Sequence, residues 1–218
     1  MRKIILIILI LLLSKVCPVQ ALGVEWTSGH HEVLEGDNYN EIRIFQDVTL
    51  DVLGGDIHTL TTYNHTVSDI SGGDIFELCS HSDSIINIMG GSIYYTNAFC
   101  RSVINMSRGE TLYLTPTDDT TIHLTGGTIA HGLWAKGSSV VHIYGYNFNY
   151  VEGVGGGQLT GLWSDGIPFD IHLNDSSGVV TYDHLVFHVI PEPAALLLLG
   201  LGGLFLRKKK WQKSRNNF

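Results

Sequence analysis

A glycine recurs every 18 residues through the middle of this chain. The marks are Gly36, Gly54, Gly72, Gly90 and Gly126, with Arg108 at the skipped position and Gly145 one residue late. Each mark follows a short apolar-polar-apolar run such as Ile86-Asn87-Ile88, which is typical of a strand with one buried face. A Gly-Gly pair then permits positive φ, and so a sharp corner.

One such unit cannot bury its apolar face alone, whereas stacked copies can. Eighteen residues suit one coil of a parallel β-helix, so we expect a β-solenoid over residues 22–150, with an N-terminal cap or irregular first coil before the first good copy. Its coils would lie about 4.8 Å apart. A right-handed coil is favoured, because parallel crossovers are right-handed and no six-residue subperiod is found. A sandwich of hairpins around the Gly-Gly pairs is the alternative.

The repeat register predicts three inward ladders of apolar side chains and one outward polar ladder. The first inward ladder is Leu50, Ile86, Ile104, Ile122 and Val141, interrupted by Ser68; the second is Val52, Ile70, Ile88, Met106, Leu124 and Ile143; the third is Ile57, Ile75, Ile93, Ile129 and Phe148. The outward ladder is Asp51, Asp69, Asn87, Asn105, His123 and His142. Its side chains could bind a metal or a sugar, but we favour a solvated face and predict no metal ligand.

The first 21 residues have the pattern of a secretory signal peptide. Arg2 and Lys3 precede an unbroken apolar run from Ile4 to Leu13, and Ala21 is the expected cleavage position. Ten apolar residues are too few to span a bilayer comfortably as a permanent anchor.

The charge of the core disfavours nucleic acid as a partner. Nine of the 13 basic residues lie in the two end segments, which leaves four basic against 20 acidic residues and a core charge near −16. Such a surface repels phosphate backbones.

No catalytic motif is found in the sequence, so we predict no enzyme, no catalytic residue and no cofactor. A nucleophile elbow, a His-Glu-x-x-His motif and a phosphate loop are all missing. Arg101 and Arg108 have no clear acidic cluster beside them, in contrast to pectin-cleaving β-helices. His30-His31 is a weak metal candidate, because adjacent rings on a strand point to opposite faces.

Cys79 and Cys100 lie three residues out of register, so two buried free thiols are favoured over a disulfide. For Trp26, Trp134 and Trp163, packing in the caps is favoured over sugar stacking.

The period ends after Phe148, and residues 151–189 are expected to close the stack as an antiparallel β cap. Asp165-Gly166 lies between two strand-like runs, 159–163 and 169–173, which is a hairpin signal. One or two final strands are expected over 179–189.

The tail has three features in order. Pro191-Glu192-Pro193 is followed by an apolar run from Ala194 to Leu206 and by the basic cluster 207–210. Together residues 190–210 resemble the PEP-CTERM sorting signal of Gram-negative bacteria. The apolar run would form a short membrane helix, with the basic cluster and the tail 211–218 on the cytoplasmic side. Residues 143–148, followed by 157–162 and Asp165-Gly166, also resemble a segment common in such proteins of planctomycete-like bacteria, a match that carries no known activity.

The resemblance implies recognition at Pro-Glu-Pro by an exosortase, a membrane protease-transpeptidase, after export through the inner membrane. The chain would be anchored transiently and then delivered to the cell surface or an exopolysaccharide matrix. We therefore expect an exported structural or adhesive protein. The alternative is a carbohydrate-binding or polysaccharide-cleaving β-helix.

Overall fold

The computed structural model describes residues 23–176 and 178–191. Within these residues the strands form a 17-stranded sheet wound into a solenoid. The predicted signal peptide with Ala21, Glu192 and Pro193, the predicted membrane helix and the tail 211–218 lie outside the described residues. No helix within the described ranges is long and apolar enough to cross a bilayer.

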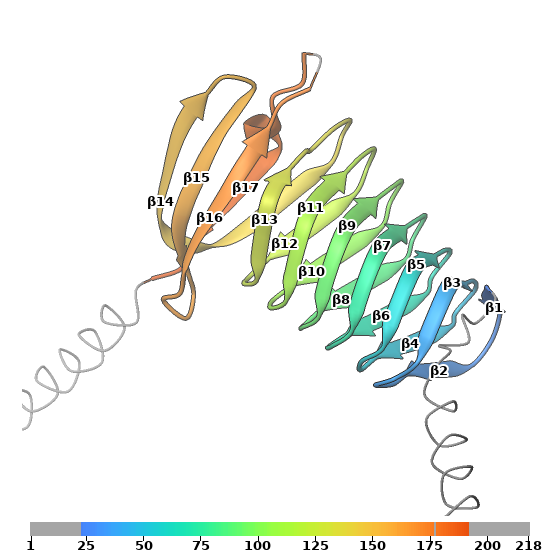
Figure 1. Ribbon diagram of the computed structural model, residues 1–218. Coiled ribbons are helices and arrows are strands. Elements are labelled where there is room, and N and C mark those ends of the chain that lie inside the picture. The colour runs from blue at the N-terminus through green and yellow to red at the C-terminus, as the bar shows by residue number, and fades with distance from the viewer. Residues whose placement is uncertain (1–22, 177, 192–218) are drawn as a thin grey trace, which may run out of the picture.

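Each coil contains a short strand of four residues and a longer strand of six or seven (Figure 1). The short strands are β2 (His30–Val33), β4 (Thr49–Val52), β6 (Val67–Ile70), β8 (Ile85–Ile88), β10 (Val103–Met106) and β12 (Thr121–Leu124). The long strands are β3 (Asn38–Ile44), β5 (Asp56–Thr62), β7 (Asp74–Ser80), β9 (Ser92–Ala98), β11 (Glu110–Pro116) and β13 (Thr128–Leu133). The expected N-terminal cap is an irregular first coil, in which β1 (Val24–Trp26) pairs in parallel with β3 and β2 with β4.

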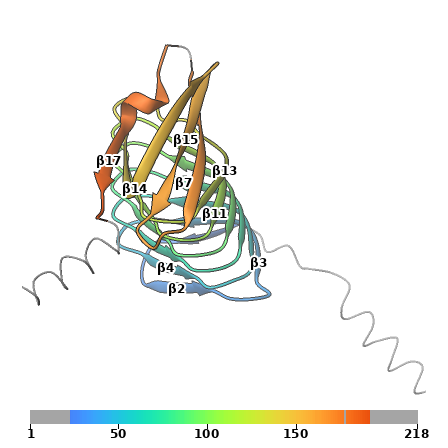
Figure 2. The same ribbon diagram turned by 90° about the vertical axis from the view of Figure 1, so that its left-hand side faces the viewer.

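The coils stack in parallel with the predicted register. Ile70 lies opposite Ile88, and Ile88 lies opposite Met106. Figures 1 and 2 show the chain turning in a right-handed sense as it advances from β2 to β13. The parallel β-helix prediction is therefore confirmed, and the hairpin sandwich is excluded.

The predicted inward ladders form the core. Their aliphatic members are at most 4% exposed, and Ser68 is buried among them. A fourth inward ladder was not predicted: Ile42, Leu60, Leu78, Leu114 and Leu133, with Thr96 at the remaining rung. It exists because each long strand bends after its second residue, so that His58 and Thr59 both face away from the core.

Phe148 was wrongly placed in the third ladder. It lies in β14 (Val140–Gly153), beyond the part of this strand that stacks in parallel on β12. There β14 bulges and pairs antiparallel with β15, and the Phe148 ring packs against Phe169 and Phe187.

The corners require glycine where consecutive coils approach each other. Gly73 has φ +81°, and a Cβ at this position would lie 2.7 Å from the carbonyl oxygen of Gly54 in the preceding coil. Any side chain would therefore meet both backbone strain and a steric clash. This explains the regular 18-residue spacing of the glycines, because glycine corners allow successive coils to stack at the separation of paired strands.

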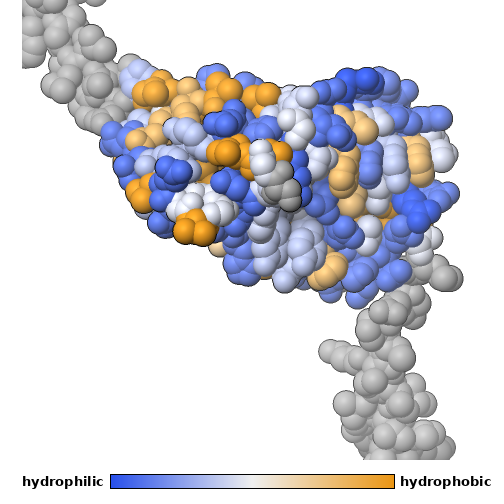
Figure 3. All heavy atoms as spheres, turned by 90° about the horizontal axis from the view of Figure 1, so that it is seen from above, coloured by the Kyte–Doolittle hydropathy of each residue, from blue (hydrophilic) through white to orange (hydrophobic). Residues whose placement is uncertain are grey.

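The C-terminal region mixes antiparallel and parallel pairing. β15 (Gly156–Trp163) and β16 (Pro168–Asn174) form the antiparallel hairpin around Asp165-Gly166 that was predicted. After a 3-10 turn (Thr181–His184), β17 (Leu185–Val189) pairs in parallel with β14, contrary to the expected antiparallel arrangement. β17 adds one more rung to the short-strand face and covers the edge of β14. Figure 3 shows apolar residues gathered over this C-terminal end, while the coils present a mostly hydrophilic face.

Candidate functional site

The outward polar ladder occupies the third residue of successive short strands. Its register runs Glu32, Asp51, Asp69, Asn87, Asn105, His123 and His142 from coil to coil. The prediction that Asp51 to His142 share one face is confirmed. The chemistry changes along the ladder from carboxylates through amides to imidazoles, so each part is considered separately.

The two side-chain amides in the middle of the ladder form hydrogen bonds with the residues next to them along it. Asn105 Nδ2 donates to Asn87 Oδ1 at 2.8 Å, and Asn87 Nδ2 donates to Asp69 Oδ1 at 2.6 Å. This chain of hydrogen bonds runs along the solenoid axis. It stabilises the stack and supplies the Asp69 carboxylate with an amide donor.

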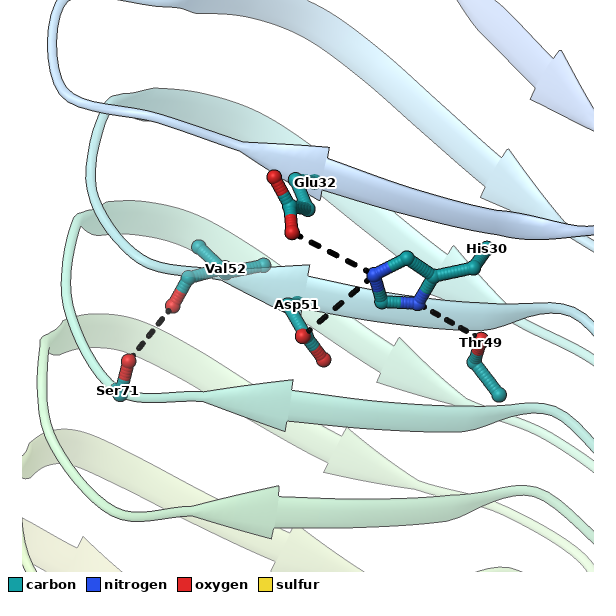
Figure 4. Close-up of polar contacts among 6 residues, drawn as sticks. All are labelled: His30, Glu32, Thr49, Asp51, Val52 and Ser71. Atoms are coloured by element: carbon teal, nitrogen blue, oxygen red, sulfur yellow. Dashed lines mark hydrogen bonds and ion pairs between the residues drawn. The ribbon is translucent and has the colours of Figure 1, made fainter.

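The N-terminal end of the ladder brings three metal-ligating side chains together (Figure 4). His30 Nε2 lies 3.6 Å from Glu32 Oε1 and 3.7 Å from Asp51 Oδ2. One ligand atom from each residue lies within 4.8 Å of the other two. On the opposite ring edge, His30 Nδ1 contacts Thr49 Oγ1 at 3.0 Å.

The sequence identified His30 only as a weak candidate and did not find its partners. His30 and His31 do diverge as predicted, and the His31 ring stacks on Trp26 at 4.3 Å. Glu32 joins the ladder through a 19-residue step to Asp51, one longer than the regular repeat. That irregular first coil hid the grouping.

The C-terminal end of the ladder is a histidine cluster. The rings of His123 and His142 stack at 4.8 Å, and His142 Nδ1 lies 2.9 Å from His188 Nε2. Burial lowers the pKa of both His123 and His142, and the neighbouring histidines lower each further. The cluster is therefore arranged for neutral imidazoles that share hydrogen bonds.

Aromatic side chains form two further rows on the outer surface. One row is Phe45, Tyr63, His81 and Phe99, with ring centroids 4.7–5.0 Å apart and nearly parallel planes. The other begins at His58, Phe76 and Tyr94, with centroids 4.8 and 5.3 Å apart. Because each ring covers the face of the next, the rows present mainly ring edges to solvent. A groove of about 310 Å³ runs along the second row, bordered by Asp56 and Asp74.

The tryptophans serve mainly in packing. Trp163 is only 4% exposed and stacks on Phe169 at 4.1 Å. Trp26 packs against the first coil, and Trp134 lies against Tyr113 with centroids 5.5 Å apart.

The two thiols are free, as favoured, but only one is sheltered. Cys79 is partly buried, whereas Cys100 is exposed at a turn, which corrects the expectation of two buried thiols. Burial raises the pKa of the Cys79 thiol to about 11, and the Glu77 carboxylate adds to the effect. Cys79 is therefore a protonated, weak nucleophile near neutral pH.

Arg101 is held in a structural ion pair. Its Nε and Nη2 donate to the two carboxylate oxygens of Asp83 in the preceding coil, at 2.8 and 3.0 Å. This contact lowers the pKa of Asp83 and raises that of Arg101. The guanidinium links two coils and is already satisfied.

The described part of the sorting signal ends at Pro191, which is exposed just after β17. The described chain is thus a β-solenoid body with a short C-terminal extension that begins after β17. The family comparison finds the PEP-CTERM protein-sorting motif at residues 189–210. The chain therefore carries this motif, which implies export and processing by an exosortase. Neither the curated proteins nor the solved structures contain a match to the chain.

Proposed function

We propose that this chain is a structural or adhesive protein of the cell surface or extracellular matrix, with a non-catalytic solenoid as its body. In this role an exosortase acts on Pro191-Glu192-Pro193, and the chain is held transiently in the inner membrane by the segment 194–206. Exopolysaccharide is the proposed surrounding material.

The observation that carries the proposal is that many surface side chains of the solenoid contact side chains of the adjacent coil. Amides, aromatic faces and ion pairs connect each coil to the next: Asn105 to Asn87, Tyr63 to His81, and Arg101 to Asp83. Contacts along the axis stiffen a repeat protein, whose stability is a sum of repeat and interface terms. A stiff rod displayed by a sorting signal suits a scaffold or spacer.

The groove along the second aromatic row favours a second candidate function, carbohydrate binding. Phe76 and Tyr94 are 44% and 37% exposed there, and acidic side chains stand beside them. Sugar recognition commonly combines an apolar surface with polar groups that bind hydroxyls. The covered ring faces favour edge contacts over extensive stacking, so we rank this function second.

Sorting is tested in a host that has an exosortase. Replacement of Pro191-Glu192-Pro193 by three alanines is expected to leave the unprocessed chain in the inner-membrane fraction. An Ile190→Ala variant, which leaves the three residues intact, is the matched control and should be processed. Normal release of the triple variant would contradict the sorting assignment.

The role of the body is tested with the exported protein on a glycan array and in polysaccharide-degradation assays. The structural proposal predicts no turnover, and hydrolysis or elimination of any polysaccharide would overturn it. Glycan binding that is lost in Phe76→Ala but kept in Phe99→Ala, a ring of the other row, would favour the carbohydrate-binding candidate.

A further inference from the structure

We propose that His30, Glu32 and Asp51 form a surface site for a divalent transition-metal ion, with Zn²⁺ as the representative ion. The site would join the first two coils, because His30 and Glu32 belong to β2 and Asp51 belongs to β4. This inference is independent of the proposed structural role.

The spacing of the ligand atoms matches a metal better than a set of direct hydrogen bonds. Zn–N and Zn–O bonds of about 2.1 Å at tetrahedral angles place ligand atoms about 3.4 Å apart. The His30 Nε2 distances to Glu32 and Asp51, 3.6 and 3.7 Å, differ from this by only a few tenths of an ångström. They are too long for good N–H···O hydrogen bonds. The ligand atoms of Glu32 and Asp51 lie within 4.8 Å of each other, so rotations of these exposed side chains would bring all three ligand atoms around one ion.

The imidazole is oriented by a neighbour on the next coil. Thr49 is the register partner of His30, and its hydroxyl oxygen lies 3.0 Å from Nδ1. A hydrogen bond at one ring nitrogen fixes the ring and leaves the other free to ligate, which is the usual outer contact of a metal-bound histidine. Figure 4 shows Nε2 directed between the two carboxylates.

The charges at this end of the ladder favour a cation. Glu32 and Asp51 lie in register on adjacent parallel strands, where like charges destabilise the pairing. In the described part of the chain, His30 is the only basic side chain within 4 Å of either carboxylate. The guanidinium of Arg43 belongs to the long strand β3, where it pairs with Glu25 and Glu41. A divalent ion would neutralise the two carboxylates.

One imidazole and two carboxylates are borderline and hard ligands. This set suits Zn²⁺ and other first-row divalent ions, which accept mixed nitrogen and oxygen ligands. Ca²⁺ prefers six to eight oxygen ligands, so it should bind more weakly.

The chain offers a matched comparison at His65. His65 Nε2 also lies near a carboxylate, 3.9 Å from Asp83 Oδ2. However, the guanidinium of Arg101 already donates hydrogen bonds to both carboxylate oxygens of Asp83. Both His30 and His65 are mostly exposed, with side chains 52% and 71% accessible, so neither substitution removes core packing.

The test is calorimetric titration of the full chain, stripped of metal with a chelator, with ZnCl₂. His30→Ala and Glu32→Gln should each weaken one binding event by about tenfold or more, while His65→Ala should bind as the unaltered chain does. A thermal melt with Zn²⁺ should show a shift in the unaltered chain and in His65→Ala, and a smaller shift in the other two.

Equal Zn²⁺ affinity and stoichiometry in His30→Ala and the unaltered chain would overturn the proposal. Loss of the tight event in His142→Ala would also overturn it, since the ion would then bind the C-terminal histidine cluster. Circular dichroism of each variant verifies that its β structure is retained.

Discussion

The inward ladder makes a quantitative prediction for two adjacent isoleucines of β8. Ile86 is fully buried, with Ser68 and Ile104 as its register partners, whereas Ile85 points outward and is 38% exposed. The same substitution by alanine therefore probes the two faces of one strand, one residue apart.

The expected losses follow from the burial of each side chain. Removing three carbons from Ile86 costs about 2.4 kcal/mol of transfer free energy at about 0.8 kcal/mol per carbon. A residual cavity of about 50 Å³ adds about 1.2 kcal/mol, so Ile86→Ala should lower the free energy of unfolding by about 3.5 kcal/mol. Ile85→Ala leaves no enclosed cavity and should cost about 1–1.5 kcal/mol, in proportion to the side chain's burial.

The assay is urea denaturation of the full chain followed by far-ultraviolet circular dichroism, with the slope of the transition checked for each variant. A difference of about 2 kcal/mol in the predicted order supports the register. Equal losses, or a larger loss for Ile85→Ala, would refute it, because a shift of one residue exchanges the two faces of a strand.

Three further predictions concern the buried hydroxyls, the corners and the histidines. The Ser68 hydroxyl is buried with no hydrogen-bond partner among the described residues, whereas that of Ser84 contacts Thr62 and Ser80. In urea denaturation, Ser68→Ala should therefore raise the free energy of unfolding by about 1 kcal/mol, and Ser84→Ala should lower it by about as much. The opposite order would contradict the claim that the Ser68 hydroxyl is unpaired and the Ser84 hydroxyl is paired. Gly73→Ala should lower the melting temperature more than Gly36→Ala, because both glycines have positive φ but a Cβ at Gly36 would meet nothing within 4 Å; similar losses would show that coil contact does not matter. Because burial lowers the folded-state pKa of His142, its contribution to stability is complete above the unfolded pKa of about 6.5 and is lost as the pH falls below that value. Urea midpoints at pH 7.5 and 5.5 should differ less in His142→Asn than in the unaltered chain, and an equal difference would count against the cluster.

Most of the fold could be predicted because each coil repeats the same sequence pattern. The glycine spacing and the alternation in runs such as Ile86-Asn87-Ile88 fix the stack, the register and the outward ladder. The fourth inward ladder was missed because two successive outward residues, His58 and Thr59, interrupt the period-two pattern at a bend. The parallel pairing of β17 was missed because it joins residues more than 40 positions apart in sequence. Local pattern carries no information about that contact.

The candidate metal site was harder to predict than the fold. Its three residues come from two coils separated by an irregular 19-residue step, and the sequence shows only an adjacent histidine pair. The sorting signal lies at the other extreme, since its recognition depends on a short contiguous motif that needs no folded context.

The central claim, that coils 18 residues apart lie in register, can be tested by disulfide formation. In a chain with Cys17, Cys79 and Cys100 replaced by serine, Asn87→Cys and Asn105→Cys place two thiols on register partners, whose Cα atoms are about 4.8 Å apart and within the range of a disulfide. The control pairs Asn87→Cys with Ser107→Cys, two positions further along, about 8 Å away. The solenoid predicts rapid oxidation of the first pair and little of the second, and preferential bridging of the second pair would contradict the fold.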